Sequence, residues 1–234
     1  MNMEAMIDKY FRPGRLPHIW CPGCGNGVVT GTIVKAVAKL DLDKDKVAVI
    51  SGIGCSSRAS GYLDFNTVHS AHGRALPVAT GVKLADPGLT VIVVTGDGDA
   101  TAIGGNHLIH AARRNIDMTV VLYNNSIYGM TGGQMAPTTL IGMKTATCPY
   151  GRDVTIHGYP LKMTEIAATL EGTAYVTRQA VHTVAAIRKA KKAIRKAFEN
   201  SMNGKGSNLV EIVSTCNSGW KMTPQASNDW MVEH

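Results

Sequence analysis

The chain has 234 residues and a mass of 24.9 kDa, which is the size of one large domain. Hydrophobic residues make up 44% of it and charged residues 18%, so the composition excludes fibrous, low-complexity and disordered classes. Its apolar runs fall far short of the roughly 18 residues that a membrane-spanning helix needs. The opening segment MNMEAMIDKY lacks the pattern of an export signal. We therefore expect a cytoplasmic protein without membrane association.

The formal net charge is +7, from 24 basic and 17 acidic residues. Most of the excess lies in residues 183–199, a predicted helix rich in lysine and arginine. No basic run alternates with aromatic residues, so the stacking surface of a nucleic-acid-binding protein is not expected. A solvated helix face is the plainer interpretation of the basic segment, and an acidic protein partner is the alternative.

Strand-like and helix-like segments alternate along the chain. In chain order we expect a helix at 25–40, strands at 47–51 and 91–95, a helix at 101–114, a strand at 118–123, a long ordered loop at 127–161, a helix at 164–170, a strand at 173–176, a helix at 181–199 and a strand at 209–213. This alternation predicts an α/β fold, a doubly wound parallel sheet with helices on both faces. Ligands of such a sheet bind beyond the carboxyl ends of its strands.

Polar or glycine-rich segments directly follow the predicted strands. They are GIGCSS, GDGDAT, NNSIYGMTGGQ and STCNSGW. Because the carboxyl ends of parallel strands share one edge of the sheet, we expect the chemistry of the protein to lie in these segments.

Five cysteines occur, an odd number in a chain without an export signal, which counts against a disulfide framework. In the segment CPGC, Cys21 and Cys24 have a spacing that lets both sulfurs face one metal centre. Cys55 and Cys216 each follow a predicted strand, so they would lie at the same edge of the sheet. Cys148 lies in the long loop and is expected to be a spare thiol. The residues alone do not decide between zinc and iron.

A second cluster of polar residues surrounds Asp97, which follows one predicted strand, and Asn125, which follows the next. Carboxylate and amide oxygens are ligands that Mg²⁺ accepts together with phosphate oxygens. Gly96 and Gly98 would let a diphosphate approach backbone N–H groups. Ordinary turn chemistry is the competing interpretation. The sequence contains neither a complete dinucleotide fingerprint nor a P-loop.

The run GDGDATAIGGNHLIHAARRNIDMTVVLYNN resembles the thiamine-diphosphate motif. Together with CPGCG, GIGCSSR, HGRALPVATGVKLA, YGMTGGQMAPTT and STCNSGW, it makes the chain similar to the beta subunit of the 2-oxoacid:ferredoxin oxidoreductases. The likeness runs from about residue 12 to 220. It implies that residues 1–234 form a single domain with the thiamine-diphosphate-binding fold, whose N-terminal CxxC segment and C-terminal tail contribute to an iron-sulfur site.

The resemblance also implies a set of site residues. Cys21, Cys24, Cys55 and Cys216 would bind one 4Fe-4S cluster, and Cys148 would be free. Asp97, Asn125 and the backbone carbonyl of Ile127 would bind Mg²⁺. The residues expected to bind thiamine diphosphate are Ile53, Gly54, Cys55, Ser56, His72, Gly96, Asp97, Gly98, Asp99, Asn125, Ile127, Gly129, Met130 and Thr131. For His72 the alternative is a histidine that only supports its loop through hydrogen bonds.

The reaction implied is oxidative decarboxylation of a 2-oxoacid with coenzyme A, giving acyl-CoA and CO₂, with electrons passing through the cluster to ferredoxin. No catalytic residue is assigned here, because the activating glutamate of the family belongs to the partner alpha subunit. Gamma and ferredoxin-like delta subunits are further candidate partners, and the basic segment 183–199 is a candidate docking site for ferredoxin.

The loop YGMTGGQMAPTT resembles the 2-oxoglutarate and branched-chain members of the family more than the pyruvate members. Gly132 occupies a position where some relatives carry a lysine that contacts the substrate, so a second substrate carboxylate would need a cation from elsewhere. We expect 2-oxoglutarate as substrate, with 2-oxoisovalerate or pyruvate as alternatives.

Two other classes of function stay open at this stage. A thiamine-diphosphate lyase or synthase without redox chemistry would explain the GDGD and NN segments and leave the four cysteines without a role. A zinc-stabilised binding protein would leave the spacing of the GDGD and NN segments to chance.

Overall fold

The computed structural model describes residues 2–234 and is built on a six-stranded sheet. Its strands, in spatial order, are β2 (Asn66–His69), β1 (Val47–Ser51), β3 (Thr90–Gly96), β4 (Thr119–Asn124), β8 (Ser207–Val213) and β7 (Thr173–Ala180). All neighbouring strands of this sheet run parallel. The predicted parallel α/β fold is therefore confirmed.

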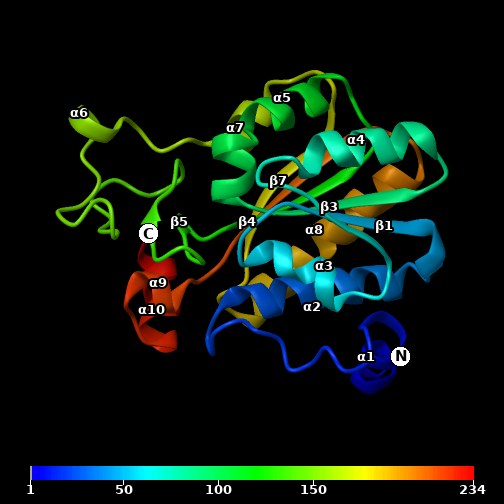
Figure 1. Ribbon diagram of the computed structural model, residues 1–234, viewed down its shortest axis with the longest axis horizontal. Coiled ribbons are helices and arrows are strands. Elements are labelled where there is room, and N and C mark those ends of the chain that lie inside the picture. The colour runs from blue at the N-terminus through cyan, green and yellow to red at the C-terminus, as the bar shows by residue number, and fades with distance from the viewer. Residues whose placement is uncertain (1) are drawn as a thin grey trace.

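Helices cover both faces of the sheet (Figure 1). One face carries α1 (Met3–Tyr10), α2 (Gly25–Lys39), α3 (Ala59–Tyr62) and α8 (Val184–Met202), and the other carries α4 (Ala75–Ala85), α5 (Gly105–Arg113) and α7 (Met163–Ala168). Within the described part of the chain, no helix combines the length and apolar character needed to cross a membrane.

The central strands are apolar along their whole length because helices bury them on both sides. Every residue of β1 is buried, and so are the inner residues of β3 and β4. This continuous burial explains why these strands were predictable from short apolar runs without alternation. The two hydrophobic cores, one on each face, are separated by the sheet itself.

The order of the strands places a topological switch point between β1 and β3. From β1 the chain goes to β2 on one side, and it then returns to form β3 and β4 on the other side. In a doubly wound sheet the loops at the carboxyl ends of the two switch-point strands separate and leave a crevice for ligands. The crevice here is formed by the segments that follow β1, β3 and β4.

Some element boundaries differ from those predicted. The helix expected at 101–114 is preceded by a π-helical turn, Gly98–Ile103, and α5 begins only at Gly105. The edge strand β2 was not predicted, because its side chains are mostly exposed and lack an apolar pattern. Helix α4 was not predicted either, and it buries only Ala75, Leu76 and Ala79. The short 3-10 helices Lys44–Lys46 and Ser56–Arg58 also escaped prediction.

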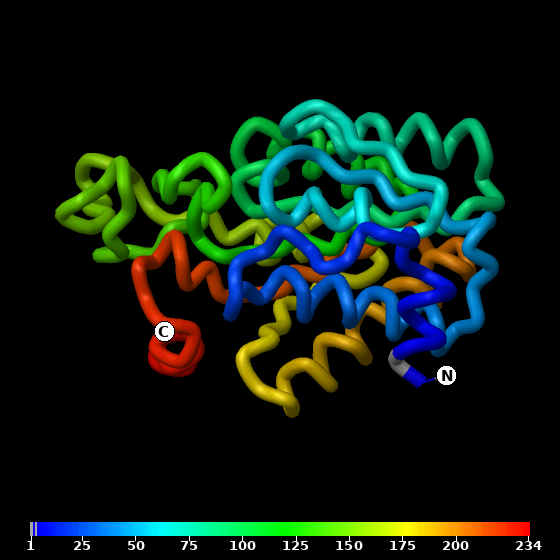
Figure 2. Tube along the Cα trace, turned by 60° about the horizontal axis from the view of Figure 1, so that its bottom comes forward, coloured from blue at the N-terminus to red at the C-terminus, as the bar shows by residue number. Residues whose placement is uncertain are grey.

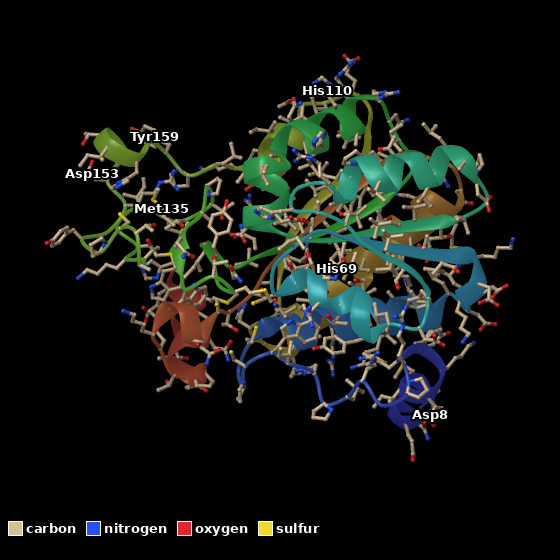
Figure 3. All side chains as sticks on the ribbon, viewed as in Figure 1. Asp8, His69, His110, Met135, Asp153 and Tyr159 are labelled. Atoms are coloured by element: carbon tan, nitrogen blue, oxygen red, sulfur yellow. The ribbon has the colours of Figure 1, made fainter. Side chains whose placement is uncertain are left out.

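Residues 127–161 form an ordered segment beyond the carboxyl ends of the strands. It contains the small antiparallel pair β5 (Ile127–Tyr128) and β6 (Gln134–Met135) and the single turn α6 (Val154–His157). Arg152, which is 5% exposed, holds it together by donating to the backbone carbonyls of Pro137, Thr139 and Tyr159. Figure 3 shows Met135, Asp153 and Tyr159 on this segment, away from the sheet.

The C-terminal residues lie at the same end of the molecule. They form α9 (Asn217–Trp220) and α10 (Pro224–Glu233), which pack on each other through Trp220 and Trp230, with ring centroids 5.0 Å apart. Figures 1 and 2 both show this pair beside the 127–161 segment and far from the N-terminus. Segments from distant parts of the sequence therefore meet at one edge of the sheet.

Helix α8 is amphipathic, as the sequence indicated. Ala190, Ile194, Ala197 and Phe198 are buried against α2 and the sheet. The four lysines of this helix and Arg188 are exposed on its other side, and Arg195 is partly buried. The helix is thus anchored by its apolar face and presents a basic face to solvent.

We predict that Phe198→Ala lowers the free energy of unfolding by about 3–5 kcal/mol, because the ring is fully buried and its loss leaves a cavity. Denaturant unfolding of the purified chain measures this change. Val232→Ala is the control, since Val232 is 68% exposed and its truncation should change stability by no more than about 0.5 kcal/mol. Equal unfolding midpoints for the two variants would contradict the assignment of α8 to the core.

Candidate active site and thiol pocket

A pocket of about 210 Å³ opens at the switch point of the sheet. Every residue predicted to bind thiamine diphosphate lines it, and Tyr123 and Tyr128 complete the lining. The three segments that follow β1, β3 and β4 supply most of this lining. The geometry thus brings the predicted set together, and the two tyrosines were not identified from the sequence.

Asp97 is the buried acid of this pocket. It is 2% exposed, and the hydroxyl of Thr138 donates to its Oδ2. Burial raises the pKa of Asp97 to about 6, although hydrogen bonds from Thr138 and from the backbone N–H groups of Gly98 and Ser126 oppose this increase. A carboxylate held in such a place is costly without a cation beside it.

The chain turn that carries Asn125 lies close to Asp97, because the backbone N–H of Ser126 lowers the pKa of that carboxyl group. Ser126 adopts a left-handed conformation with φ 60°, which the side chain of Asn124 stabilises by accepting from the Ser126 N–H at 3.0 Å. The indole Nε1 of Trp220 donates to the Asn125 carbonyl at 3.0 Å. These contacts hold Asn125 and Ile127 at the pocket beside Asp97.

Asp99 also lines the pocket, but its carboxylate faces the protein. Its Oδ1 accepts from the backbone N–H groups of Gly73 at 2.7 Å and Ile53 at 3.2 Å, and its Oδ2 accepts from Thr95 at 2.6 Å. His72 Nδ1 lies 2.7 Å from the same Oδ1. Asp99 therefore joins three loops and orients the imidazole of His72, which leaves Nε2 as the ring nitrogen available to a ligand.

Tyr128 closes one side of the pocket. Its hydroxyl donates to the Gly98 carbonyl at 3.1 Å, and burial, with the nearby carboxylates of Asp97 and Asp99, raises the pKa of Tyr128. A methyl group on Gly98 would overlap the Tyr128 ring. Glycine is therefore required at position 98 by the close approach of an aromatic ring.

A second pocket, of about 310 Å³, lies beside the first and contains four thiols. They belong to Cys21, Cys24, Cys55 and Cys216. Cys148 is buried elsewhere, with its sulfur 3.6 Å from Nε2 of His157. The structure thus gathers the four cysteines that the resemblance singled out and leaves the fifth apart.

Hydrogen bonds between the two ends of the chain assemble this thiol pocket. The backbone N–H of Gly25 donates to the Thr215 carbonyl at 3.2 Å, and the Thr215 hydroxyl donates to the Gly23 carbonyl at 2.9 Å. Asn217 Nδ2 donates to the Pro22 carbonyl at 3.1 Å. The CPGC turn and the STCN segment are therefore held against each other.

Two further contacts complete the wall of the thiol pocket. Trp20 Nε1 donates to the backbone carbonyl of Cys55 at 2.6 Å, which connects the CPGC turn to the end of β1. A methyl group placed on Gly219 would come within 2.9 Å of the Cys216 sulfur, and one on Gly129 within 3.1 Å. Glycine at these positions leaves the sulfur accessible from the pocket.

The thiols influence one another electrostatically. Burial, with a smaller contribution from the neighbouring cysteines, raises the pKa of Cys24 to about 11 and that of Cys216 to about 12. Burial and Cys21 raise the pKa of Cys55 as well. The backbone N–H groups of Asn26 and Gly219 lower the pKa of Cys24 and of Cys216, respectively, and so oppose the increase. Metal binding would replace the protons that these thiols hold near neutral pH.

The thiols surround a space rather than a single point. In residues 2–234, no three histidine, cysteine or acidic side chains converge closely enough to hold one metal ion. None of the five cysteines, all of which lie in this described range, forms a disulfide.

The two pockets share one wall. Cys55, Asn125, Gly129 and Met130 line both of them. A ligand in the first pocket and one in the second would therefore be in van der Waals contact with the same few residues.

Comparison with known proteins gives a consistent result. Residues 37–212 match the family described as "Thiamine pyrophosphate enzyme, C-terminal TPP binding domain". The chain is 49% identical to the 2-oxoglutarate synthase subunit KorB of Archaeoglobus fulgidus over 95% of this chain and 78% of that protein. It is 41% identical to the ketoisovalerate oxidoreductase subunit VorA of Methanothermobacter marburgensis over 92% of this chain and 45% of that protein.

A solved structure shares the fold. The 2-oxoglutarate:ferredoxin oxidoreductase from Magnetococcus marinus, with 2-oxoglutarate, coenzyme A and succinyl-CoA bound, superposes with a TM-score of 0.78 at 38% identity, over 90% of this chain and 67% of that chain. The family match over residues 37–212, together with a parallel sheet that carries a pocket at its switch point, identifies the chain as part of a thiamine diphosphate enzyme. The chain belongs to the beta subunits of the 2-oxoacid:ferredoxin oxidoreductases.

We predict that Gly98→Ala weakens binding of thiamine diphosphate in Mg²⁺ at least about tenfold, because the added methyl group displaces the Tyr128 ring into the pocket. Titration calorimetry of the chain with the cofactor measures the affinity. Gly81→Ala, in α4, is the matched control, since no atom lies within 4 Å of its added carbon. It should keep the affinity and gain about 0.5–1 kcal/mol of helix stability. Undiminished affinity in Gly98→Ala would show that the cofactor binds elsewhere.

Proposed function

We propose that this chain is the thiamine-diphosphate-binding and electron-transferring subunit of a 2-oxoglutarate:ferredoxin oxidoreductase. One observation carries the proposal: a pocket lined by four cysteines shares a wall with the pocket at the switch point. A non-redox lyase or synthase would have no use for this arrangement. The substrate follows from the 2-oxoglutarate enzymes among the relatives.

Thiamine diphosphate fits the first pocket through Mg²⁺. Asp97 is a buried carboxylate without a neighbouring cationic side chain in the described lining, and a divalent ion would offset the cost of its charge. Asp97, Asn125 and the carbonyl of Ile127 would hold the ion, while Gly96 and Gly98 would let the diphosphate approach the backbone. When bound, thiamine diphosphate supplies the nucleophilic carbon that reacts with the 2-oxoacid.

A 4Fe-4S cluster fits the thiol pocket. It requires four thiolates set around a cluster of several atoms, since each iron takes one of them. The four cysteines line a space of about 310 Å³. When bound, the cluster supplies a one-electron acceptor. A zinc ion would instead need all four sulfurs within about 2.3 Å of one point.

The residues of this chain would hold the cofactor in place and shield it from water. None of its carboxylates is assigned a role in proton transfer. Asp99 orients His72 toward the cofactor pocket, and Tyr128 and Met130 cover the pocket from the 127–161 segment. Cys55 would be a cluster ligand at the wall of the cofactor pocket, so electrons would cross this wall directly. The activating glutamate is assigned to the partner alpha subunit.

The second carboxylate of 2-oxoglutarate requires a cation that this pocket does not supply. Among the described residues, neither lysine nor arginine lines the pocket. Gly132 has φ +112°, a conformation that disfavours a lysine at this position. The partner alpha subunit would therefore complete substrate recognition, with gamma and ferredoxin-like delta subunits as further members of the complex. Residues 1–234 would act as a single domain in it.

We predict that Cys216→Ser removes the visible absorbance and electron paramagnetic resonance of the cluster from anaerobically purified complex, because one of four iron ligands is lost. Cys148→Ser is the matched control, since Cys148 lies outside the thiol pocket and should keep the full iron content. An unchanged spectrum in Cys216→Ser, or an iron-free wild-type complex, would refute the cluster assignment and favour a non-redox enzyme.

The substrate is tested by activity. The chain is co-expressed anaerobically with the partner subunits encoded beside it, and reduction of a viologen dye is measured with coenzyme A and one 2-oxoacid at a time. We expect the largest kcat/KM with 2-oxoglutarate. A larger value with 2-oxoisovalerate, the alternative suggested by the ketoisovalerate relative, or with pyruvate would reassign the substrate. Turnover with none of them would refute the oxidoreductase proposal.

A further inference from the structure

The first turn of α2 contains a buried amide without a partner. Asn26 is 0% exposed, and neither its Nδ2 nor its Oδ1 has a hydrogen-bond partner among residues 2–234. Buried amide groups in proteins are nearly always hydrogen-bonded, because the loss of their water is otherwise uncompensated. Its polar atoms therefore indicate a partner that the chain itself does not supply.

Asn26 lines the thiol pocket together with the four cysteines. It follows Cys24 by two residues at the start of α2, so the residue lies close in the chain to one of the proposed cluster ligands. Asn217, the other asparagine of the proposed ligand segments, uses its Nδ2 on the Pro22 carbonyl. Asn26 thus brings an uncommitted N–H donor to the pocket.

The sulfurs of a 4Fe-4S cluster and of its cysteine ligands are hydrogen-bond acceptors. Each N–H···S bond stabilises the reduced cluster more than the oxidised one, because reduction adds negative charge to the sulfurs, and it raises the reduction potential. The amide of Asn26 is not itself an iron ligand, since four thiols are present for four irons.

We propose that the side-chain amide of Asn26 donates a hydrogen bond to a sulfur of the cluster and thereby raises its reduction potential. This inference rests on the proposed function, because it requires the cluster in the thiol pocket. Asn26 would then contact the electron acceptor directly. It would contact neither the 2-oxoacid nor coenzyme A.

The test is the reduction potential of the cluster in the complete anaerobic complex, followed by electron paramagnetic resonance. Asn26→Leu keeps a similar side-chain volume and removes the donor. We expect it to lower the equilibrium constant for one-electron reduction about tenfold, which corresponds to 59 mV. Thr32→Val is the matched control, because this hydroxyl is also buried in α2 but donates to Val28 of its own helix at 2.7 Å. Its potential should equal that of the wild type.

A second measurement separates this role from a role in the fold. In the cluster-free chain, the unfolding temperature of Asn26→Leu should be at least as high as that of the wild type, because the amide has no hydrogen-bond partner among residues 2–234. A much lower unfolding temperature would assign the amide to the fold and overturn the inference, as would an unchanged potential in the loaded variant. Failure of the variant to retain a cluster, with unchanged unfolding of the cluster-free chain, would support the contact. A wild-type complex without cluster would instead refute the proposed function.

Discussion

The contact between the CPGC turn and the STCN segment is the constraint on which the site depends. These segments lie at opposite ends of the sequence, three hydrogen bonds hold them together, and Gly25 approaches Ser214 closely. A methyl group on Gly23 would overlap Pro224, and one on Gly25 would overlap Ser214. Without this contact, Cys21 and Cys24 would have no fixed position relative to Cys216. The thiol pocket is therefore a product of chain topology as much as of cysteine spacing.

The parallel sheet supplies the second half of the site. Its switch point between β1 and β3 separates two loops and places Asp97 in the lining of the crevice, and the segment after β4 brings Asn125 to the same pocket. Asp99, two residues further on, is committed to the protein through Gly73, Ile53, Thr95 and His72. The two acids of GDGD thus divide their roles: one is available to a ligand, and the other braces the loops.

Much of this arrangement was predictable from sequence, for a physical reason. Buried strands such as 47–51 give continuous apolar runs, and the segments that follow them had to meet at one edge, so Asp97, Asn125 and Cys55 could be placed together. Thr138, which donates to Asp97 from 41 residues away, was not predictable, because nothing in an irregular loop signals a long-range contact. Tyr128 and Asn26 were missed since their roles depend on packing around a pocket. Strand β2 was missed because its residues are mostly exposed and show no apolar pattern typical of a buried strand.

The wall formed by Cys55, Asn125, Gly129 and Met130 belongs to both pockets. Because the same four residues line both pockets, a substitution in this wall changes both pockets at once. A substitution that widened the cofactor pocket to admit a bulkier 2-oxoacid would also change the lining of the thiol pocket. Under the proposed function, substrate range and the reduction potential of the electron acceptor would therefore be coupled, and an attempt to engineer one should measure the other.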